Sequence, residues 1–370
     1  MTFSVITHAI HKKEGGQLYA YAPYVREMNL WAKHVDEIVI LAPVSNEDLL
    51  PIETAYIHSN IKIVEIPNFD VTSLNNVIRS FFVIPKILLM IYRVMRKTDH
   101  IHLRCPGNIG LLGCLVQILF PKKPKTAKYA GNWDPKAKQP LSYNLQKWIL
   151  SNTVFTKNMQ VLVYGDWPNQ SKNIKPFFTA SYKNLEIEKP MVRDYSNNLK
   201  FVFVGTLAQG KQPLVAIQLV EALRKHGKLV TLDLYGEGVL RESLESYIAD
   251  HNLEHIAILH GNQPQSTVKE AIKTAHFSIL PSKSEGWPKA LAEAMFFGAI
   301  PIATSVSCVP YMLDEGIRGI LLENDLSADC AKILALLNAE HVLQEMSQAA
   351  ASWSQQYTLD RFDEEIVKLL

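Results

Sequence analysis

Short strand-like runs alternate with helix-like segments twice along the chain, and this alternation is what most restricts the folds open to it. Runs of β-branched and other apolar residues favour buried strands, and the longer periodic segments between them favour helices. Short connections between such segments are typical of a parallel sheet with helices on both faces. In the first half we expect strands at residues 3–7, 37–42, 62–66 and 100–103, and helices at residues 24–34 and 77–97.

The second half repeats this pattern after a polar stretch. Residues 183–198, which are mostly polar and include Pro190, form the expected linker. Residues 350–370 favour a helix with a break at Tyr357 and Thr358. The strands expected between these segments are 200–204, 230–235, 256–260, 277–281 and 300–303, and the helices are 214–226, 241–251, 267–274 and 288–297.

The sequence therefore predicts an α/β fold with two doubly wound, Rossmann-like domains that face each other across a cleft. A length of 370 residues suits two domains at the usual size of roughly 100–200 residues each. We place the domains at residues 1–190 and 191–355, followed by a C-terminal helix at 356–370 that packs back on the first domain. Ligands of such folds bind beyond the carboxyl ends of the strands.

The net charge of +2 hides an uneven distribution. Residues 1–190 contain 23 Lys/Arg and 14 Asp/Glu, whereas the remaining residues contain 15 Lys/Arg and 22 Asp/Glu. A basic half indicates contact with an anionic surface or substrate, although ordinary surface scatter is the alternative reading. No feature of the sequence indicates a nucleic-acid partner.

Cysteine usage and the first residues indicate a reducing compartment. The four cysteines form no C-x-x-C pair, so we expect neither a zinc site nor a disulfide framework. The first ten residues lack a basic leader and are expected to form a strand rather than a signal peptide. We expect a cytoplasmic protein, with peripheral association at the inner face of the plasma membrane as an additional expectation.

Two apolar stretches, residues 81–92 and 109–120, raise the question of membrane contact. Each is about 12 residues long, and a membrane-spanning helix needs roughly 20. Basic residues follow both stretches. Buried core helices are the favoured interpretation, and contact of one stretch with a membrane surface is the alternative.

The clearest chemical signal lies where the expected strand at 277–281 leads into a helix. The intervening residues are Glu285, Gly286, Trp287 and Pro288. Proline suits a first helical turn, and glycine lets a ligand approach the backbone closely. The free N–H groups at such a helix start can bind a phosphate.

Glu285 and Glu293 are the candidate hydroxyl-binding residues of this segment. A carboxylate can accept hydrogen bonds from vicinal hydroxyls of a sugar or a ribose. We expect Glu285 to lie toward the transferred sugar and Glu293 toward the ribose. Taken as an isolated pair, they would more simply be ordinary glutamates at a helix start and within a helix.

The wider segment resembles the retaining glycosyltransferases of family four, also called glycosyl transferases group 1. These enzymes have the two-domain B-type fold (GT-B) and a signature of two glutamates separated by seven residues. The resemblance implies that residues 1–190 bind an acceptor and residues 191–355 bind a nucleotide-sugar donor. The matching residues are Glu285, Gly286, Trp287, Pro288, Glu293, Ala294, Met295, Gly298, Pro301, Ile302 and Ala303.

Three upstream segments, at residues 201–213, 234–245 and 259–272, extend the resemblance. Lys211 matches the lysine that binds the donor diphosphate, whereas Thr206 replaces the arginine that usually follows Gly205. Arg104 is a candidate replacement for that cation. The donor-binding residues that the resemblance implies are Gly15, Gly16, Gly205, Thr206, Lys211, Gly261, Asn262, Gln263, Glu285, Gly286, Trp287, Pro288, Lys289 and Glu293.

The acceptor side departs further from the family. Ala130 stands where many relatives carry a histidine. For Trp133 a core position is as good an interpretation as a sugar-stacking one. The acceptor residues that we expect are His8, Arg104, Asn132, Trp133 and Asp134.

The resemblance implies transfer with retention of configuration and without an enzyme nucleophile. Glu285 and Lys211 are the expected catalytic residues, because positioning and charge stabilisation would carry the reaction. The sequence has no D-x-D motif, so we expect no metal, and we expect no cofactor besides the UDP- or GDP-sugar substrate. The acceptor would be a glycan or a lipid-linked glycan of bacterial surface polysaccharide or lipopolysaccharide, at an anionic membrane.

Two alternatives remain open. A nucleotide-sugar epimerase or a sugar phosphorylase would share the architecture but lacks this signature. A catalytically degenerate protein that binds sugar or a partner protein is favoured by Thr206 and Ala130, and disfavoured by Glu285, Glu293 and Lys211.

Overall fold

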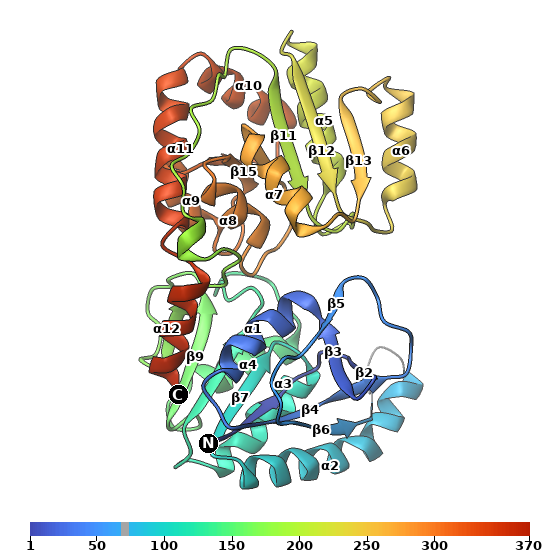
Figure 1. Cartoon of the computed structure of the whole chain (residues 1–370), viewed down its shortest axis with the longest axis vertical. Helices are drawn as coiled ribbons and strands as arrows, with labels where there is room; N and C mark the ends of the chain where they lie inside the picture. Colours follow the sequence, from blue (N-terminus) through green and yellow to red (C-terminus); the bar gives the residue numbers. More distant parts are fainter. Residues whose placement is uncertain (68–73) are drawn as a thin grey trace. The chain divides into compact units, whose positions relative to one another are not determined.

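The computed structural model describes residues 1–67 and 74–370, and the side chains at residues 74–82 lie outside the described set. The first two residues of the apolar stretch at 81–92 are among them. The chain forms two compact units (Figure 1). Unit 1 comprises Met1–Phe177 and Asp363–Leu370, and unit 2 comprises Phe178–Phe362, so the division lies ahead of the predicted boundary at residue 190.

Unit 1 is built on one sheet with the strand order β10-β9-β8-β7-β1-β4-β2-β3-β5, and β6 also pairs with β4. The elements are β1 Thr2–Ile6, β2 His11–Glu14, β3 Gln17–Tyr21, α1 Ala22–Ala32, β4 Glu37–Ser45, β5 Glu53–Ala55, β6 Ile61–Ile66, α2 Leu74–Lys97, β7 His100–Cys105, α3 Asn108–Val116, η1 Gln117–Leu119, β8 Lys125–Tyr129, α4 Leu141–Ser151, β9 Met159–Tyr164 and β10 Ile174–Phe177.

The central strands of unit 1 are parallel, as the alternation predicts. β1 pairs with β4 on one side and β7 on the other, and β7 continues through β8 to β9 and β10. Each residue of β7 is buried, because helices cover both faces of a doubly wound sheet. Figure 1 shows α2 running along this sheet near β6.

The hairpin of β2 and β3 and the short strand β5 were not predicted. β2 runs antiparallel to β3, and β3 runs antiparallel to β5. Half of β2 and much of β3 lie at the surface, so these strands carry little of the apolar pattern that marks a buried strand.

Unit 2 has a fully parallel sheet among its described strands, with the order β13-β12-β11-β14-β15-β16. Figure 1 shows β11, β12 and β13 side by side. The elements are η2 Asn184–Glu186, β11 Leu199–Val204, α5 Pro213–Lys225, β12 Val230–Tyr235, α6 Arg241–Asp250, β13 Ala257–Gly261, α7 Gln265–Thr274, β14 Phe277–Leu280, α8 Lys289–Phe296, β15 Ile300–Thr304, α9 Val309–Leu313, η3 Asp314–Gly316, β16 Ile320–Leu322, α10 Leu326–Leu337 and α11 Glu340–Ser354.

The last helix, α12 (Leu359–Leu369), begins in unit 2, and its residues from Asp363 belong to unit 1. In unit 1, Asp363 Oδ1 lies 3.0 Å from His34 Nε2. The break expected at Tyr357 and Thr358 separates α11 from α12. The C-terminal helix therefore returns to the first unit, as predicted.

The apolar stretch at residues 109–120 forms α3 and η1, with six buried residues in α3. The described part of the other stretch forms the second half of α2, where Ile87, Ile91 and Met95 are buried. Within the described residues, no helix is long and apolar enough to cross a bilayer. Both stretches thus contribute to the core of unit 1.

Candidate functional site

Lys211 and Glu285 form an ion pair at the carboxyl ends of the unit 2 strands. Lys211 Nζ lies 2.6 Å from Glu285 Oε1. The Glu285 side chain is 7% exposed, whereas the Lys211 side chain is 32% exposed. An ammonium group has three donors, so Lys211 retains donors for an anion while it holds the carboxylate in place.

Two loops are tied together to make this pair. The Lys283 N–H donates to the Gly210 carbonyl at 2.9 Å, which aligns the loop after β14 with the loop after β11. Gln212, the N-cap of α5, has a left-handed backbone with φ 50°, and Pro213 opens the helix. The chain therefore turns sharply immediately after Lys211.

The Glu285–Gly286 backbone is fixed from a second side. The Glu285 N–H donates to Ser307 Oγ at 3.2 Å, and Cys308 Sγ donates to the Gly286 carbonyl at 2.8 Å. Burial and the nearby charge of Glu285 raise the pKa of the Cys308 thiol. Cys308 therefore stays a neutral hydrogen-bond donor to this loop.

Glycines let the loops after β11, β12 and β13 interlock. A Cβ on Gly236 would lie 2.0 Å from the Gly205 carbonyl oxygen, and a Cβ on Gly238 would lie 2.4 Å from that of Leu207. The Gly236 N–H donates to the Gly261 carbonyl at 2.9 Å. Only glycine permits this close approach, which brings the predicted Gly205 and Gly261 to one edge of the sheet.

The predicted nucleobase loop follows Gly261. Asn262 and Gln263 are exposed, and Gln263 Nε2 donates to the His260 carbonyl at 2.8 Å. His260 stacks on Tyr235 with a centroid separation of 4.6 Å. The His260–Tyr235 stack and the Gln263 hydrogen bond thus fix the start of this loop, while Asn262 and Gln263 remain exposed to solvent.

The predicted phosphate-binding helix is α8, which begins at Lys289 with Pro288 as its N-cap. Proline has no side-chain acceptor, so the first N–H groups of α8 are not capped by that residue. Glu293 lies one turn further and accepts a hydrogen bond from Ser181 Oγ. Glu285 and Glu293 therefore face different partners within unit 2.

Of the predicted donor residues Trp287 and Thr206, the first has a buried side chain and the second an exposed one. Trp287 is 7% exposed and stacks on Trp353 at 5.8 Å, with Tyr357 at its edge. Its side chain packs in an aromatic cluster, so the backbone is what this residue presents to a ligand. Thr206 is exposed beside Gly205.

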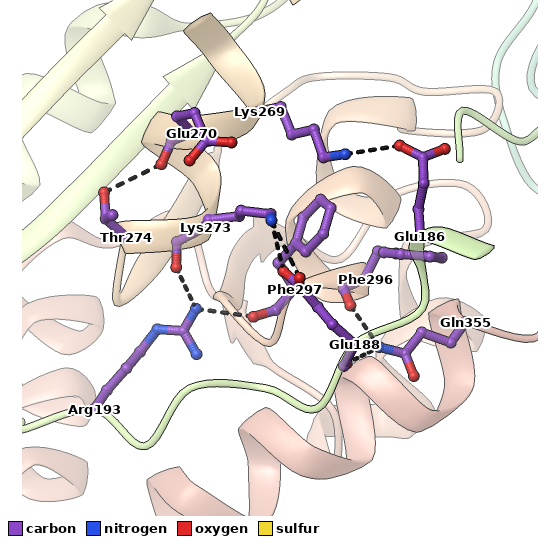
Figure 2. Close-up of polar contacts among 10 residues, drawn as sticks. All are labelled: Glu186, Glu188, Arg193, Lys269, Glu270, Lys273, Thr274, Phe296, Phe297 and Gln355. Carbon is purple, nitrogen blue, oxygen red and sulfur yellow. Dashed lines mark hydrogen bonds and ion pairs between the residues drawn. The ribbon is translucent and has the colours of Figure 1, made fainter. Parts of the chain in front are cut away.

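The segment expected to be a linker is bound to unit 2 through Arg193, a buried residue (Figure 2). Its guanidinium donates to the carbonyls of Ala275 at 2.7 Å, Lys273 at 3.1 Å and Phe297 at 2.9 Å. These carbonyls end α7 and α8, so one cation caps both helices. The loop that precedes α7 contains the predicted donor residues Asn262 and Gln263, and Pro288 directly precedes α8.

Further contacts secure the same segment. Lys269 pairs with Glu186 at 2.7 Å and Lys273 with Glu188 at 2.9 Å (Figure 2). A Cβ on Gly298 would lie 2.7 Å from Pro190 Cβ, so this signature glycine makes room for the segment. Residues 183–198 are thus part of unit 2, because cations on α7 and the Arg193 contacts hold them there.

In unit 1, Gly15 and Gly16 form the two-residue turn of the β2–β3 hairpin. Glu14 pairs with Gln17 across the turn, and the glycines have φ values of 57° and 79°. Positive φ at both positions is the reason for a Gly-Gly pair in such a turn. Both glycines are exposed, so their N–H groups are accessible.

His8 lines a pocket of about 240 Å³ at the carboxyl ends of β1 and β7. Gly107, Asn108 and Tyr143 also line it. A Cβ on Gly107 would lie 2.8 Å from His8 Nδ1, so glycine allows the imidazole into this place. Desolvation and the positive charge of Arg104 lower the pKa of His8, which favours the neutral ring.

Arg104 lies in a buried ion cluster with Glu27 and Lys128. Its Nη1 donates to Glu27 Oε1, and Lys128 Nζ lies 2.9 Å from Glu27 Oε2. Burial raises the pKa of Glu27, but the two cations outweigh it and lower the pKa to about 2. Arg104 thus has a buried partner in unit 1, and its replacement of the missing family arginine stays a prediction.

The loop at residues 132–134 is ordered by its own hydrogen bonds. The Asp134 N–H donates to Asn132 Oδ1 at 2.8 Å, and Asp134 Oδ1 accepts from the Lys136 N–H at 2.8 Å. Trp133 is 2% exposed and donates to Gln170 Oε1 at 3.0 Å. The sugar-stacking role for Trp133 is wrong, because its ring lies in the core against Tyr129.

Several residues at these sites were not predicted from the sequence. Glu27 and Lys128 lie in ordinary helix and strand patterns, which give no sign of an ion cluster. Asn108 could have been found, because Pro-Gly-Asn directly after a buried strand is a strand–turn–helix signal. Within the described residues, no group of three or more His, Cys, Asp or Glu side chains could hold a metal ion.

Known proteins resemble part of the chain. Residues 186–353 match the family described as "Glycosyl transferases group 1". An uncharacterized glycosyltransferase of Methanocaldococcus jannaschii is 27% identical over 169 residues, which are 45% of this chain and 46% of that protein. The amylovoran biosynthesis glycosyltransferase AmsK of Erwinia amylovora is 32% identical over 149 residues, which are 38% of this chain and 37% of that protein.

The chain thus aligns with less than half of each of these relatives. A solved structure of HepE from Anabaena, in complex with UDP and glucose, covers 100% of this chain with 98% of its own length at a TM-score of 0.68 and 14% identity. That likeness concerns the fold. The chain has the GT-B fold. Its residues 186–353 are similar to glycosyl transferases group 1.

Proposed function

We propose that this protein transfers a sugar from a nucleotide-sugar donor to a saccharide or lipid-linked saccharide acceptor. The Lys211–Glu285 pair carries this proposal, since a cation and a carboxylate meet beside an uncapped helix start. A diphosphate needs cationic and N–H donors, and a sugar needs hydroxyl acceptors. Unit 2 offers both within one set of loops.

The donor is a UDP- or GDP-sugar. The supporting observation is the loop at Asn262 and Gln263, which is exposed after a supported strand end and suits a nucleobase. UDP is the nucleotide in the HepE complex, which favours uridine by analogy of fold alone.

The reaction proceeds with retention of configuration and without metal. Lys211 and the N–H groups at the start of α8 stabilise the negative charge on the leaving diphosphate. Glu285 accepts hydrogen bonds from the transferred sugar, and Glu293 from the ribose. No side chain needs to act as a nucleophile, because the leaving phosphate can accept the acceptor proton.

The biological product is a bacterial surface polysaccharide or lipopolysaccharide. The AmsK relative is an amylovoran biosynthesis glycosyltransferase, which supports a polysaccharide product. The basic excess of residues 1–190 supports an anionic partner for this half, either a membrane surface or an acidic acceptor.

Release of nucleoside diphosphate tests the proposal. Purified protein is incubated with a panel of UDP- and GDP-sugars and candidate oligosaccharide acceptors, and free diphosphate is measured. Wild type should release it with at least one donor, and Lys211→Ala should not. Lys283→Ala is the matched control, because Lys283 is an exposed lysine on the neighbouring loop. Equal turnover by wild type and Lys211→Ala would refute the assignment.

A further inference from the structure

The basic excess of the first half comes from one stretch of sequence. Residues 100–180 contain eleven Lys/Arg and two Asp/Glu, whereas residues 1–99 contain ten of each. Arg104 and Lys128 are already paired with Glu27. Lys123 and Lys147 donate to backbone carbonyls. Several of the remaining basic residues of the stretch lie together on the surface of unit 1.

Five of these lysines line one groove of about 700 Å³. They lie at the amino ends of β8, β9 and β10 and in the loops that precede those strands. The lysines are Lys122, Lys125, Lys157, Lys172 and Lys175.

The positive charge of the groove is not compensated from within. In the part of the chain that the structure describes, no Asp or Glu lines the groove. Lys125 donates to the carbonyls of Phe120 at 2.9 Å and Gln117 at 3.4 Å, and burial lowers its pKa to about 8. Among the described ion pairs, none joins a carboxylate to the other four lysines, so their ammonium groups are free to meet anions.

The walls of the groove are held in place by amide side chains. Asn158 Nδ2 donates to the Pro121 carbonyl at 3.0 Å. Asn173 Nδ2 donates to the Leu150 carbonyl at 2.8 Å and to Thr156 Oγ1 at 3.1 Å. Three loops are thus locked together, so the lysines project from a fixed frame rather than from mobile chain.

We propose that this groove binds an acidic glycan, namely a segment of a polysaccharide that carries carboxylate or phosphate groups. The lysines match the acid groups, and the hydroxyl and amide groups of Thr153 and Gln160 match the sugar hydroxyls. This inference rests on the proposed function and narrows the acceptor to a polyanionic polymer.

The position of the groove favours a polymer over a bilayer. His8 and the pocket around it lie at the carboxyl ends of the parallel strands, and the groove lies at the amino ends. A strand of six residues, such as β9, is about 20 Å long. A short acceptor anchored in a bilayer at the groove would therefore stay about 20 Å or more from the carboxyl ends of the strands. A polymer bound in the groove is long enough to extend to the carboxyl ends as well.

Binding of a defined polyanion tests the proposal. The probes are fluorescent oligomers of polygalacturonate and neutral dextran of matched length, titrated with the full-length protein at low salt. Wild type should bind polygalacturonate, more weakly as salt is raised, and should not bind dextran. The triple variant Lys157→Gln, Lys172→Gln, Lys175→Gln should bind about 10-fold or more weakly.

The control variant is Lys189→Gln, Lys200→Gln, Lys228→Gln, which removes the same charge from unit 2 and should bind polygalacturonate as wild type does. Equal binding by wild type and the groove variant would overturn the proposal. Binding of wild type to phosphatidylglycerol vesicles but not to polygalacturonate would also overturn it, in favour of a membrane surface.

A donor assay separates this inference from the proposed function. The groove variant should keep the thermal stabilisation that a nucleotide-sugar gives to wild type, because the groove is in unit 1 and Lys211 in unit 2. If no nucleotide-sugar stabilises wild type but polygalacturonate binding depends on the groove lysines, the proposed function is wrong and the groove is still a glycan-binding site.

Discussion

Lys211 Nζ and Glu285 Oε1 lie 2.6 Å apart, although 74 positions separate the two residues in the chain. One residue follows the first strand of unit 2, and the other follows the fourth strand along the chain. β11 and β14 are neighbours in the sheet, so their carboxyl ends meet at one place. The pair is therefore a consequence of topology rather than of sequence proximity.

Glu285→Gln keeps the shape of this side chain but removes its charge and its pairing with Lys211. We expect the turnover number to fall by about 100-fold, since the site would lose a preorganised acceptor and the orientation of Lys211. Steady-state release of nucleoside diphosphate measures this. Glu270→Gln, on the exposed face of α7, should behave as wild type. A turnover number unchanged in Glu285→Gln would remove Glu285 from the reaction.

Much of the architecture could be predicted from the sequence, because buried parallel strands and amphipathic helices leave strong periodic patterns. The predicted strand at residues 230–235 and the observed β12 coincide, and α5, α6, α7 and α8 begin and end close to their predicted bounds. The alternation of strands and helices also predicted that Lys211 and Glu285 lie in loops that follow strands. The exposed hairpin strands gave no such pattern and were not predicted. The parallel strands β9 and β10 were not predicted either.

Side-chain partners were harder to predict. Trp133 and Trp287 were both plausible ligand contacts, but both pack in aromatic clusters. Arg104 was a candidate diphosphate cation, but its partner Glu27 lies 77 positions away. Such pairings depend on which faces meet in three dimensions, and a single sequence carries no record of that.

Gly236→Ala should disrupt the interlocked loops at the edge of the unit 2 sheet. The added Cβ would lie 2.0 Å from the Gly205 carbonyl oxygen, and Gly236 has a φ of 141°. We expect a loss of about 3 kcal/mol in the free energy of unfolding, measured in urea. Gly210→Ala is the control, because its Cβ would have open space. Similar stability of the two variants would contradict the close approach.

Arg193→Met should loosen the ends of α7 and α8. The substitution leaves the carbonyls of Lys273, Ala275 and Phe297 without their charged donor. We expect the free energy of unfolding to fall by about 3 kcal/mol, with partial recovery in Arg193→Lys. Urea denaturation of both variants measures this, with Arg224→Met as an exposed control. If Arg193→Met were as stable as the control, the capping role would be untenable.

Glu27→Gln should leave Arg104 and Lys128 as buried cations without a compensating charge. Breaking a buried ion cluster in this way costs about 3–5 kcal/mol of unfolding free energy. Chemical denaturation at neutral pH measures the loss, and Glu47→Gln, at an exposed position, serves as the control. A loss below about 1 kcal/mol would mean that the cluster contributes no more than a surface pair.

Unit 1 should lose stability in mild acid because of buried histidines. Burial lowers the pKa of His100 from 6.5 to about 4. The unfolded chain therefore binds a proton more readily, so stability is fully present above pH 6.5 and falls as the pH drops toward 4. At pH 5 the loss from one such histidine is about 2 kcal/mol.

The slope of unfolding free energy against pH checks this expectation. His100→Phe removes one titrating group, so its slope between pH 6.5 and 4.5 should be shallower than that of wild type. His11, whose pKa burial also lowers to about 4, would supply part of the remaining slope. His341→Gln, at an exposed position, should leave the slope as it is. An identical slope in His100→Phe would contradict the buried neutral histidine.

The most direct test of the central claim is donor binding at the Lys211–Glu285 pair. Melting temperatures of wild type and Lys211→Ala are measured with saturating UDP- and GDP-sugars, since a ligand of the folded state stabilises it by mass action. At least one nucleotide-sugar should raise the melting temperature of wild type and leave that of Lys211→Ala unchanged. No shift in wild type with any nucleotide-sugar, or an equal shift in both proteins, would contradict the account.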